Sequence, residues 1–313
     1  MKNFAKLIKL TLLVATSTVM FSCSDDDNVT PESNTIAAIA SRNPNFTTLV
    51  AALDRAGLVQ TLDQNGPFTV FAPTNAAFND FLADNGFTSL NDIPVDVLRE
   101  VLLNHVVNGT NLSTSLSTGY VKTLGKGSAS TSNTLSMFIN TSSGVRLNGV
   151  SSVTTADIVA SNGVIHVVDA VIGLPTVVTH AAANPGFSTL VSLLTQQNLV
   201  STLDGTASSP FTVFAPNNDA FTTFETQNPG VLASLSSPQV TAVLTYHVVA
   251  GANVLSTGIP ATPITTFETG TFTIAGTTIT DERDRQTGII ATDVQASNGV
   301  IHVVNNVLLP TFD

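Results

Sequence analysis

The chain has 313 residues, of which 43% are apolar and 11% are charged, and its formal net charge is −11. That length suits two domains of ordinary size, each with enough apolar residues to bury a core. The acidic balance offers no electrostatic footprint for nucleic acid and disfavours binding to anionic lipid headgroups. Because the sequence has one cysteine, Cys23, no intramolecular disulfide is possible, and the fold must depend on packing and hydrogen bonds.

The first 22 residues are predicted to be a lipoprotein signal peptide. Lysines at positions 2, 6 and 9 precede an apolar run over residues 10–21. That run is too short to span a bilayer core of about 30 Å, but it has the length of a signal-peptide apolar region. It leads into Met20-Phe-Ser-Cys23, which resembles a bacterial lipobox with a bulky residue at Phe21. We therefore expect a lipid anchor on the Cys23 thiol; the alternative is an ordinary signal peptide with an incidental cysteine.

Residues 23–33 are predicted to be a lipidated cysteine followed by an acidic tether. Ser24-Asp-Asp-Asp27 resembles the surface-export signal of lipoproteins from Bacteroidetes-type bacteria, and a solvated tether is the alternative interpretation. The stretch that follows contains Pro31 and has no periodic apolar pattern, which is typical of a linker. The first folded domain is therefore expected to begin at residue 34.

Two long stretches of sequence recur in the same order. Phe68-Thr-Val-Phe-Ala-Pro-Thr-Asn-Ala-Ala-Phe78 returns as Phe211-Thr-Val-Phe-Ala-Pro-Asn-Asn-Asp-Ala-Phe221, at an offset of 211 − 68 = 143 residues. Ser161–Val168 returns letter for letter at Ser297–Val304. An offset of this size indicates a duplicated domain rather than a short-period solenoid. We therefore divide the chain into a first repeat, residues 34–175, and a second repeat, residues 176–313.

Helices are expected at the start of each repeat. In the first repeat, residues 35–41 form a short helix candidate, and apolar residues recur at helical spacing from Phe46 to Leu53. Asn45 can cap this second helix, and Gly57 is placed to end it.

A strand and two further helices follow in the prediction. Phe68 to Phe71 favours a buried strand, and Pro73 ends it because proline has no backbone N–H. Thr74 or Asn75 can then cap a helix, and Pro94 suits the first turn of another helix that reaches about His105.

Short β-branched segments dominate the rest of the first repeat. Helices followed by strands indicate an α+β fold. Residues 125–133 are rich in Gly, Ser and Thr and are predicted to be a flexible loop. In the second repeat, the charged stretch Asp281–Thr287 is predicted to be a hairpin loop exposed to solvent. The predicted strands of the first repeat are Tyr120–Leu124, Leu135–Ile139, Val145–Leu147, Val153–Val159 and Val164–Val171.

These motifs resemble those of the fasciclin-like domain family. The resemblance is carried by Phe-Thr-Val-Phe-Ala-Pro, by His-Val-Val after a helix, and by Asn-Gly-Val-Ile-His-Val-Val near the end of each repeat. It implies two tandem fasciclin-like domains, each a β-wedge of about seven strands with several helices. It also implies a role in adhesion or matrix interaction at cell surfaces, with no enzymatic activity and no cofactor.

The resemblance also suggests candidate adhesion residues. Fasciclin-like domains of animals have a Tyr-His motif associated with cell adhesion, and Tyr246-His247 keeps it, whereas Asn104-His105 has asparagine in place of tyrosine. Some of these domains have Asp-Ile after the final His-Val segment, linked to integrin recognition. This chain has Asp169-Ala170 and Asn305-Asn306 there, so the pair is absent from both repeats.

Other residue types give weaker indications of chemistry. The four repeated histidines are either ligands or structural donors to backbone carbonyls, and their duplication favours the structural role. No His-Glu-x-x-His, cysteine pair or EF-hand spacing indicates a metal site, and no Gly-x-Ser-x-Gly indicates a hydrolase. Asp281, Glu282 and Asp284 could contact calcium, but Arg283 and Arg285 offset their charge. The repeated histidines are His105, His166, His247 and His302.

The sequence therefore predicts a lipid-anchored protein of the outer membrane or cell surface that acts by binding. The first hypothesis is adhesion to a cell-surface or matrix protein, to a polysaccharide, or to another copy of the chain. The second is capture of glycans or peptides for a neighbouring transporter. A hydrolase is the third, and it would need a nucleophile within reach of a histidine.

Overall fold

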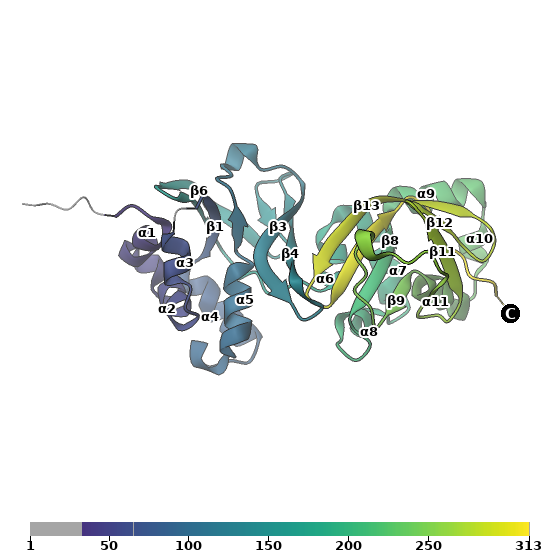
Figure 1. The fold of residues 1–313 in the computed structure, drawn as a ribbon, viewed down its shortest axis with the longest axis horizontal. Coiled ribbons are helices and arrows are strands. Elements are labelled where there is room, and N and C mark those ends of the chain that lie inside the picture. Colours follow the sequence, from purple (N-terminus) through teal and green to yellow (C-terminus); the bar gives the residue numbers. More distant parts are fainter. Residues whose placement is uncertain (1–32, 65, 313) are drawn as a thin grey trace, which may run out of the picture. The chain divides into compact units, whose positions relative to one another are not determined.

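The computed structural model describes residues 33–64 and 66–312, and residues from Asn34 onward form one compact unit (Figure 1). The predicted signal peptide, Cys23 and most of the tether lie outside the described residues. None of the helices in the described part is long and apolar enough to cross a membrane.

Both repeats begin with helices, as predicted. Those of the first repeat are α1 (Ile36–Arg42), η1 (Pro44–Phe46), α2 (Thr47–Arg55), α3 (Val59–Asp63), α4 (Asn75–Asp84), η2 (Leu90–Asp92), α5 (Val95–Leu103) and η3 (Ser113–Ser115), where η marks a 3-10 helix. Those of the second repeat are α6 (Val177–Ala183), η4 (Pro185–Phe187), α7 (Ser188–Gln196), α8 (Val200–Asp204), α9 (Asn218–Gln227), α10 (Val231–Ser234), α11 (Ser237–Tyr246) and η5 (Ser256–Gly258).

Each repeat also has seven strands among the described residues, which confirms the predicted α+β architecture. The first repeat contains β1 (Phe68–Pro73), β2 (Val106–Asn108), β3 (Gly119–Gly127), β4 (Ser130–Asn140), β5 (Arg146–Leu147), β6 (Ser151–Ala160) and β7 (Gly163–Val168). The second contains β8 (Phe211–Pro216), β9 (Val248–Ala250), β10 (Ile264–Thr265), β11 (Thr271–Ala275), β12 (Thr278–Thr280), β13 (Gln286–Ala296) and β14 (Gly299–Val304).

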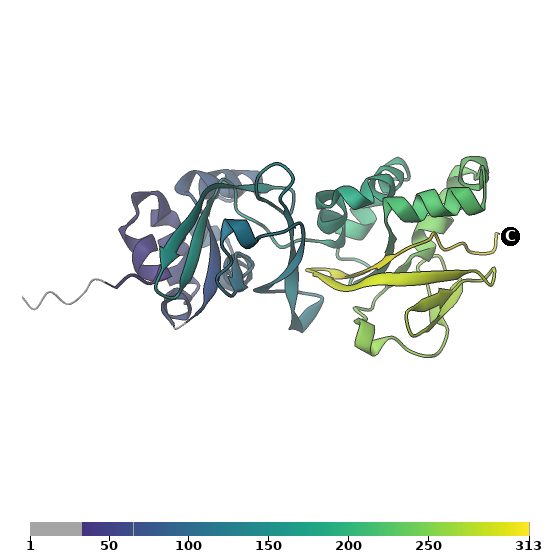
Figure 2. The same ribbon diagram turned by 90° about the horizontal axis from the view of Figure 1, so that it is seen from above.

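The first strand of each repeat pairs with the same two neighbours. β1 runs antiparallel to β2 and parallel to β7, and β8 pairs in the same way with β9 and β14. In the first repeat the seven strands close on themselves, whereas in the second they form an open sheet ordered β10-β11-β12-β13-β14-β8-β9. Figure 2 shows the α-helices of the second repeat on one side of β13 and β14.

The duplicated stretch is a strand-to-helix junction, as its sequence predicts. β1 is buried along most of its length, and Thr74 caps α4 by accepting a hydrogen bond from the backbone N–H of Ala77. Phe71 stacks on His166 with 5.5 Å between ring centroids, and Phe214 stacks on His302 in the second repeat. Its phenylalanines therefore belong to the core and not to an exposed contact surface.

The repeated asparagine before β7 holds the first helix against the strands. The Asn162 side-chain nitrogen donates to the carbonyl oxygens of Leu62 and Gln64, each at 2.8 Å, and its oxygen accepts from the N–H of Ile36 at 2.9 Å. Asn298 joins the corresponding elements of the second repeat. All these backbone groups lie at helix ends or in turns, where they have no partner within a helix or sheet. The asparagine side chain supplies hydrogen bonds to these groups instead.

Two local predictions were wrong. Residues 125–133 are not a flexible loop, because β3 and β4 extend through them as a hairpin, and the N–H of Ala129 donates to the Ser297 carbonyl oxygen at 2.8 Å. Asn45 does not cap α2, because Asn43 caps a preceding 3-10 turn and α2 begins directly after it. At residues 125–133 a long-range hydrogen bond outweighs the local composition, whereas at Asn45 a neighbouring asparagine takes the capping role.

Hydrogen bonds also join β3 and β4 of the first repeat to β13 of the second. The Lys122 ammonium donates to the Asp293 carbonyl oxygen at 2.7 Å and to the Ser136 hydroxyl at 3.1 Å. The same hydroxyl accepts from the backbone N–H of Gln295 at 3.0 Å. Burial lowers the pKa of Lys122, with Asp293 acting in the opposite direction. The repeats therefore share a polar contact in addition to the short connecting segment.

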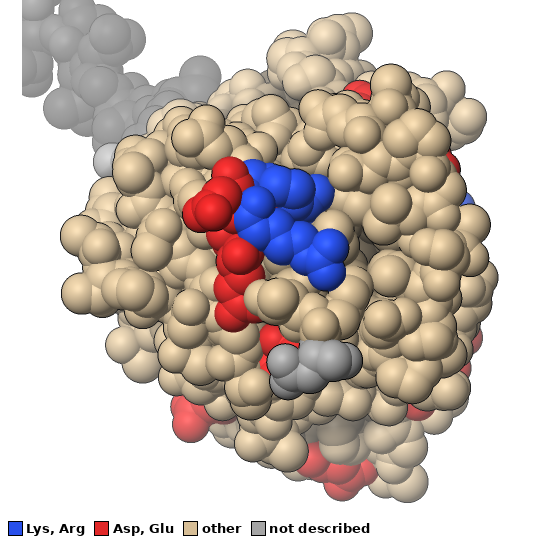
Figure 3. Space-filling view, turned by 90° about the vertical axis from the view of Figure 1, so that its right-hand side faces the viewer, with Lys and Arg blue, Asp and Glu red and all other residues tan. Residues whose placement is uncertain are grey.

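The charged stretch after β12 is a hairpin loop, as predicted, but its first residue is not solvated. The Asp281 carboxylate is buried and accepts from the backbone N–H groups of Arg283, Arg285 and Leu309, and from the Arg285 guanidinium at 2.7 Å. Figure 3 shows acidic and basic side chains in contact on a face that is otherwise mostly uncharged.

Neighbouring side chains extend this network along the C-terminal segment. Arg285 also donates to the Val307 carbonyl oxygen, and Arg283 donates to that of Pro310. Glu282 accepts from the backbone N–H and the hydroxyl of Thr311, both at 2.9 Å. The charged residues therefore fasten the end of the chain to the β12–β13 hairpin.

Replacing Asp281 with alanine is expected to lower the free energy of unfolding by about 3 kcal/mol, because it removes four hydrogen bonds and leaves a partly buried guanidinium without its carboxylate. Urea unfolding followed by circular dichroism measures the change. Asp284→Asn is the control, because Asp284 is exposed and asparagine tolerates its positive φ of 58°. Equal stability of the two variants would contradict the role given to Asp281.

Candidate functional site

The four candidate adhesion residues are buried. Tyr246 and Asn104 have no exposed surface, and His105 and His247 are 2% and 3% exposed. These side chains do not form a contact surface in this structure. Their part in adhesion stays a prediction, and the structure gives each of them a structural role.

His105 and His247 connect the end of a helix to the end of the same repeat. The Nδ1–H group of each ring donates at 2.7 Å to a carbonyl one turn earlier, Val101 or Val243. Each Nε2 accepts at 2.9 Å from a backbone N–H, that of Ile172 or Leu308. Burial lowers the pKa of both histidines to about 4, so the rings are neutral at pH 7 and these bonds use both ring nitrogens.

The other two repeated histidines have a similar role on the strands. His166 Nε2 donates to the Asn111 carbonyl oxygen at 2.9 Å, and its Nδ1 accepts from the backbone N–H of Asp157 at 3.2 Å. His302 makes the corresponding pair of contacts with Val254 and Asp293. The predicted structural role of the histidines is therefore confirmed in both repeats.

Tyr246 and Asn104 differ in type and also in the groups they join. The Tyr246 hydroxyl donates to the Thr271 carbonyl oxygen at 2.6 Å and accepts from the N–H of Glu282 at 3.2 Å, and burial raises the pKa of this phenol. Asn104 donates to the Gly173 carbonyl oxygen and accepts from the Thr123 hydroxyl. The first repeat therefore has asparagine where the second has tyrosine, and the two side chains contact different backbone groups.

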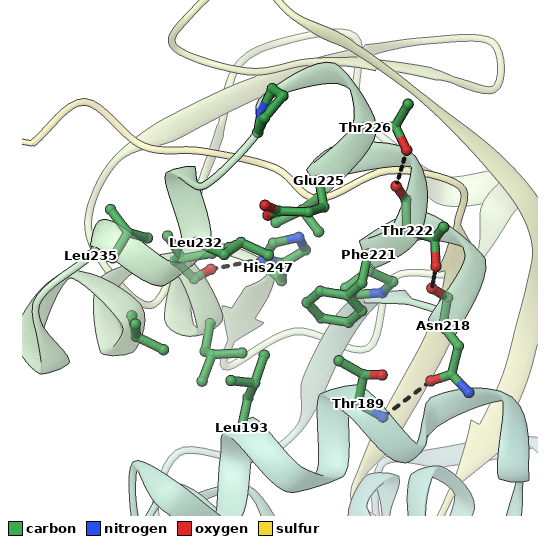
Figure 4. Close-up of a pocket in the computed structure, with 16 residues that line it drawn as sticks. Thr189, Leu193, Asn218, Phe221, Thr222, Glu225, Thr226, Leu232, Leu235 and His247 are labelled. Carbon is green, nitrogen blue, oxygen red and sulfur yellow. Dashed lines mark hydrogen bonds between the residues drawn. The ribbon is translucent and has the colours of Figure 1, made fainter.

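A large cleft lies among the helices of the second repeat. It has a volume of about 760 Å³ and is lined by side chains from α7, α9, α10 and α11, here called the helical cleft (Figure 4). Its lining is mostly apolar and includes Leu193, Phe221, Leu232, Leu235 and Val240. No sequence motif indicates this cleft.

Most polar groups that line the helical cleft have their hydrogen bonds within the protein. The hydroxyls of Thr222 and Thr226 donate to carbonyl oxygens one turn earlier in α9, and the Asn218 side chain bonds to the start of α7 (Figure 4). His247 has both nitrogens occupied, as described above. Glu225 is different, because one carboxylate oxygen accepts from the N–H of Gly230 at 2.6 Å while the side chain is exposed. Among the described residues of the lining, Glu225 is the one acidic side chain.

The first repeat fills the corresponding space. Leu82 and Phe87 pack against the core there, and at the repeat offset of 143 residues their positions are taken by Glu225 and Gly230. The second repeat therefore has a carboxylate in place of the Leu82 side chain and a glycine in place of Phe87.

The helix ends explain how Phe87 reaches its place. Gly86 has a φ of +70°, and the chain turns back so that the Phe87 N–H donates to the Leu82 carbonyl oxygen at 2.8 Å. The second repeat has Pro229 at the glycine position, and the proline ring fixes φ at about −65°, which excludes this left-handed turn. The chain leaves α9 in another direction, and α10 forms the far wall of the helical cleft.

The exposure of equivalent residues confirms that the space is filled in one repeat and open in the other. Ile93 and Leu98 are each 1% exposed. Their counterparts at an offset of 142 residues, Leu235 and Val240, are only half-buried. In the sequence, the helical cleft is indicated only by a comparison of the repeats: positions 225 and 230 lack the apolar residues that the first repeat has there.

Metal binding has no support from the geometry of the described residues. Within residues 33–64 and 66–312, no cluster of three or more His, Cys, Asp or Glu side chains is placed to hold an ion. In the charged loop, Glu282 accepts hydrogen bonds from backbone N–H groups and Asp281 accepts one from Arg285.

Comparisons with known proteins identify relatives of both repeats. The family model of the Fasciclin domain matches residues 44–175 and residues 185–310. Protein sll1483 of Synechocystis sp. is 41% identical over 143 residues, which are 46% of this chain and 75% of that protein. Uncharacterized protein sll1735 of the same organism is 37% identical over 146 residues, which are 44% of this chain and 98% of that protein.

More distant similarity extends to animal proteins. Transforming growth factor-beta-induced protein ig-h3 of Oryctolagus cuniculus is 28% identical over 200 residues, which are 63% of this chain and 28% of that protein. A solved structure of a FAS1 domain pair from the insect cell adhesion molecule fasciclin I has a TM-score of 0.48 and 21% identity. The match covers 83% of this chain and 92% of the solved one.

Proposed function

Because this chain belongs to the fasciclin domain family, we propose that it is a cell-surface binding protein that mediates adhesion or matrix interaction through its tandem domains. Fasciclin domains are associated with cell adhesion and binding to the extracellular matrix. The observation that carries the proposal is the presence of two family domains across most of the chain. The repeated histidines and asparagines, which could have suggested chemistry, have structural partners in both.

The proposed location is the outer membrane or cell surface, with a lipid on Cys23 as the anchor. Support for this part comes from the sequence: a short apolar run behind three lysines, a lipobox-like ending and an acidic tether. Acyl chains on the cysteine would hold the protein at the membrane, since each buried CH₂ contributes about 0.8 kcal/mol.

Cys23→Ser is expected to move the protein from the membrane fraction to the soluble fraction and to abolish incorporation of labelled palmitate. Fractionation and radiolabelling of cells that express the full chain measure both effects. Ser24→Ala, which leaves the thiol in place, is the control. A serine variant that stays in the membrane fraction and carries label would refute lipidation at Cys23.

Adhesion requires that the domains face outward. Protease treatment of intact cells, followed by mass spectrometry, should release peptides from residues 34–313. Deleting the gene should reduce attachment and biofilm formation, and the full chain should restore them. Full protection from protease together with unchanged attachment would count against the proposed function.

A second candidate function is capture of peptides for a neighbouring transporter. The apolar helical cleft favours this over capture of glycans, because sugars are bound through many hydrogen bonds and the polar groups in the cleft are largely occupied. Binding of purified protein to a glycan array would reverse that preference.

A further inference from the structure

We propose that the helical cleft of the second repeat binds a short amphipathic peptide segment of a partner, with apolar side chains inside the cleft and a basic side chain against Glu225. This inference rests on the proposed binding function and deepens it by naming a site and the chemistry of the partner. It concerns the second repeat alone, because the first repeat fills the equivalent space with its own side chains.

The size and lining of the helical cleft suit such a segment. Its volume of about 760 Å³ lies within the range of roughly 300–1,000 Å³ that ligand sites occupy. Leu232, Leu235 and Val240 line it and are only half-buried. Ile93 and Leu98, the counterparts of Leu235 and Val240, are covered. Apolar side chains of a partner would remove this surface from water, which is the main favourable term in association.

The polar groups of the helical cleft restrict what the segment can carry. His247 is neutral and has both nitrogens occupied, and the α9 threonine hydroxyls donate within their own helix. Glu225 is held at the cleft by its bond from Gly230, and its exposed carboxylate can accept further hydrogen bonds from a cation. The cleft therefore complements an apolar segment with a lysine or arginine and disfavours one with a carboxylate.

A peptide fits these features better than an anionic lipid or a sugar. The carboxylate and the acidic balance of the chain repel anionic headgroups. A helical peptide presents apolar side chains three and four positions apart and a basic side chain beside them, which is the recognition mode of apolar grooves between helices.

The first test measures peptide binding to residues 34–313, which form one compact unit. The probes are acetylated, fluorescein-labelled peptides of about twelve residues with leucine at the i, i+3, i+4 and i+7 anchor positions. One carries lysine beside the anchors, and its matched partner carries glutamate. We expect saturable fluorescence polarisation with the lysine peptide and about threefold weaker binding of the glutamate peptide, since exposed ion pairs contribute modestly.

Two substitutions and a control locate the binding site. Leu235→Lys introduces a charge into the apolar wall and should weaken binding of the lysine peptide at least about tenfold. Glu225→Gln keeps an oxygen for the Gly230 N–H and should remove the preference for lysine over glutamate. Val97→Lys is the control, because Val97 is 44% exposed on the equivalent helix of the first repeat, and it should leave binding within about twofold. Thermal unfolding of each variant checks that the fold is retained.

The outcomes separate this inference from the proposed function. Absence of saturable binding by the leucine peptides, or equal binding by wild type and folded Leu235→Lys protein, would overturn the inference. Cells that express the Leu235→Lys variant report on adhesion independently: a loss of attachment would place the adhesive contact at the helical cleft. Retained attachment combined with lost peptide binding would support a peptide site that is separate from adhesion.

Discussion

Replacing Gly163 with alanine is expected to lower the free energy of unfolding by more than about 4 kcal/mol. A Cβ at this position would lie 1.9 Å from the Phe68 carbonyl oxygen and 2.8 Å from its carbon. These are backbone atoms of β1, which pairs with β7 at this residue, so no side-chain rotation can relieve the contact. The φ of +151° also disfavours an L side chain.

The second repeat provides an independent copy of this experiment. A Cβ on Gly299 would lie 2.3 Å from the Phe211 carbonyl oxygen, in the same parallel pairing of β14 with β8. Gly299→Ala should therefore destabilise the second repeat as Gly163→Ala destabilises the first. Urea unfolding followed by circular dichroism measures both variants against wild type.

Gly173→Ala is the matched control for these variants. A Cβ on Gly173 would meet no atom within 4 Å, and its φ is not in the left-handed region. Its effect on the free energy of unfolding should stay within about 0.5 kcal/mol, or be slightly favourable because alanine restricts the unfolded chain. If Gly163→Ala were as stable as Gly173→Ala, close approach of β1 and β7 would not explain the repeated glycine.

The repeated motifs were readable from the sequence because their local and tertiary roles agree. The Phe-Thr-Val-Phe-Ala-Pro stretch has strand propensity, a proline that ends the ladder and a capping residue, and it forms β1 followed by α4. The asparagine and histidine near each repeat's end recur because the same backbone groups need partners in both copies. Duplication within one chain therefore indicates a structural role for these residues.

The helical cleft and the burial of Asp281 could not be predicted in this way. The cleft depends on the lack of apolar side chains at positions 225 and 230, and on the direction in which the chain leaves α9. Composition does not report either property. Asp281 sits in a stretch with charges of both signs, which is typical of a solvated loop, and its burial depends on a C-terminal segment about 28 residues away in the sequence. Long-range partners of this kind leave no local pattern.

Lowering the pH from 7 to 4 is expected to destabilise the protein strongly, chiefly through His105, His180 and His247. Burial lowers the pKa of each from 6.5 to about 4 in the folded state. Between these values the unfolded chain binds protons that the folded chain does not, so stability falls as the pH falls. The contribution is complete above pH 6.5 and is lost progressively toward pH 4. Each histidine accounts for about 3 kcal/mol, since one pKa unit corresponds to about 1.4 kcal/mol.

The sum over three histidines is comparable to the whole stability of a typical domain, which is about 5–15 kcal/mol. Acid unfolding should therefore begin before pH 4, where carboxylates such as Asp157 and Glu282, whose pKa values are lowered by their hydrogen bonds, are still ionised. Urea midpoints at pH 7, 5.5 and 4.5 should fall steadily. NMR titration of the imidazole protons should show these three rings neutral down to about pH 5. Ordinary titration near pH 6.5, or urea midpoints independent of pH, would contradict the burial of neutral imidazoles as a determinant of stability.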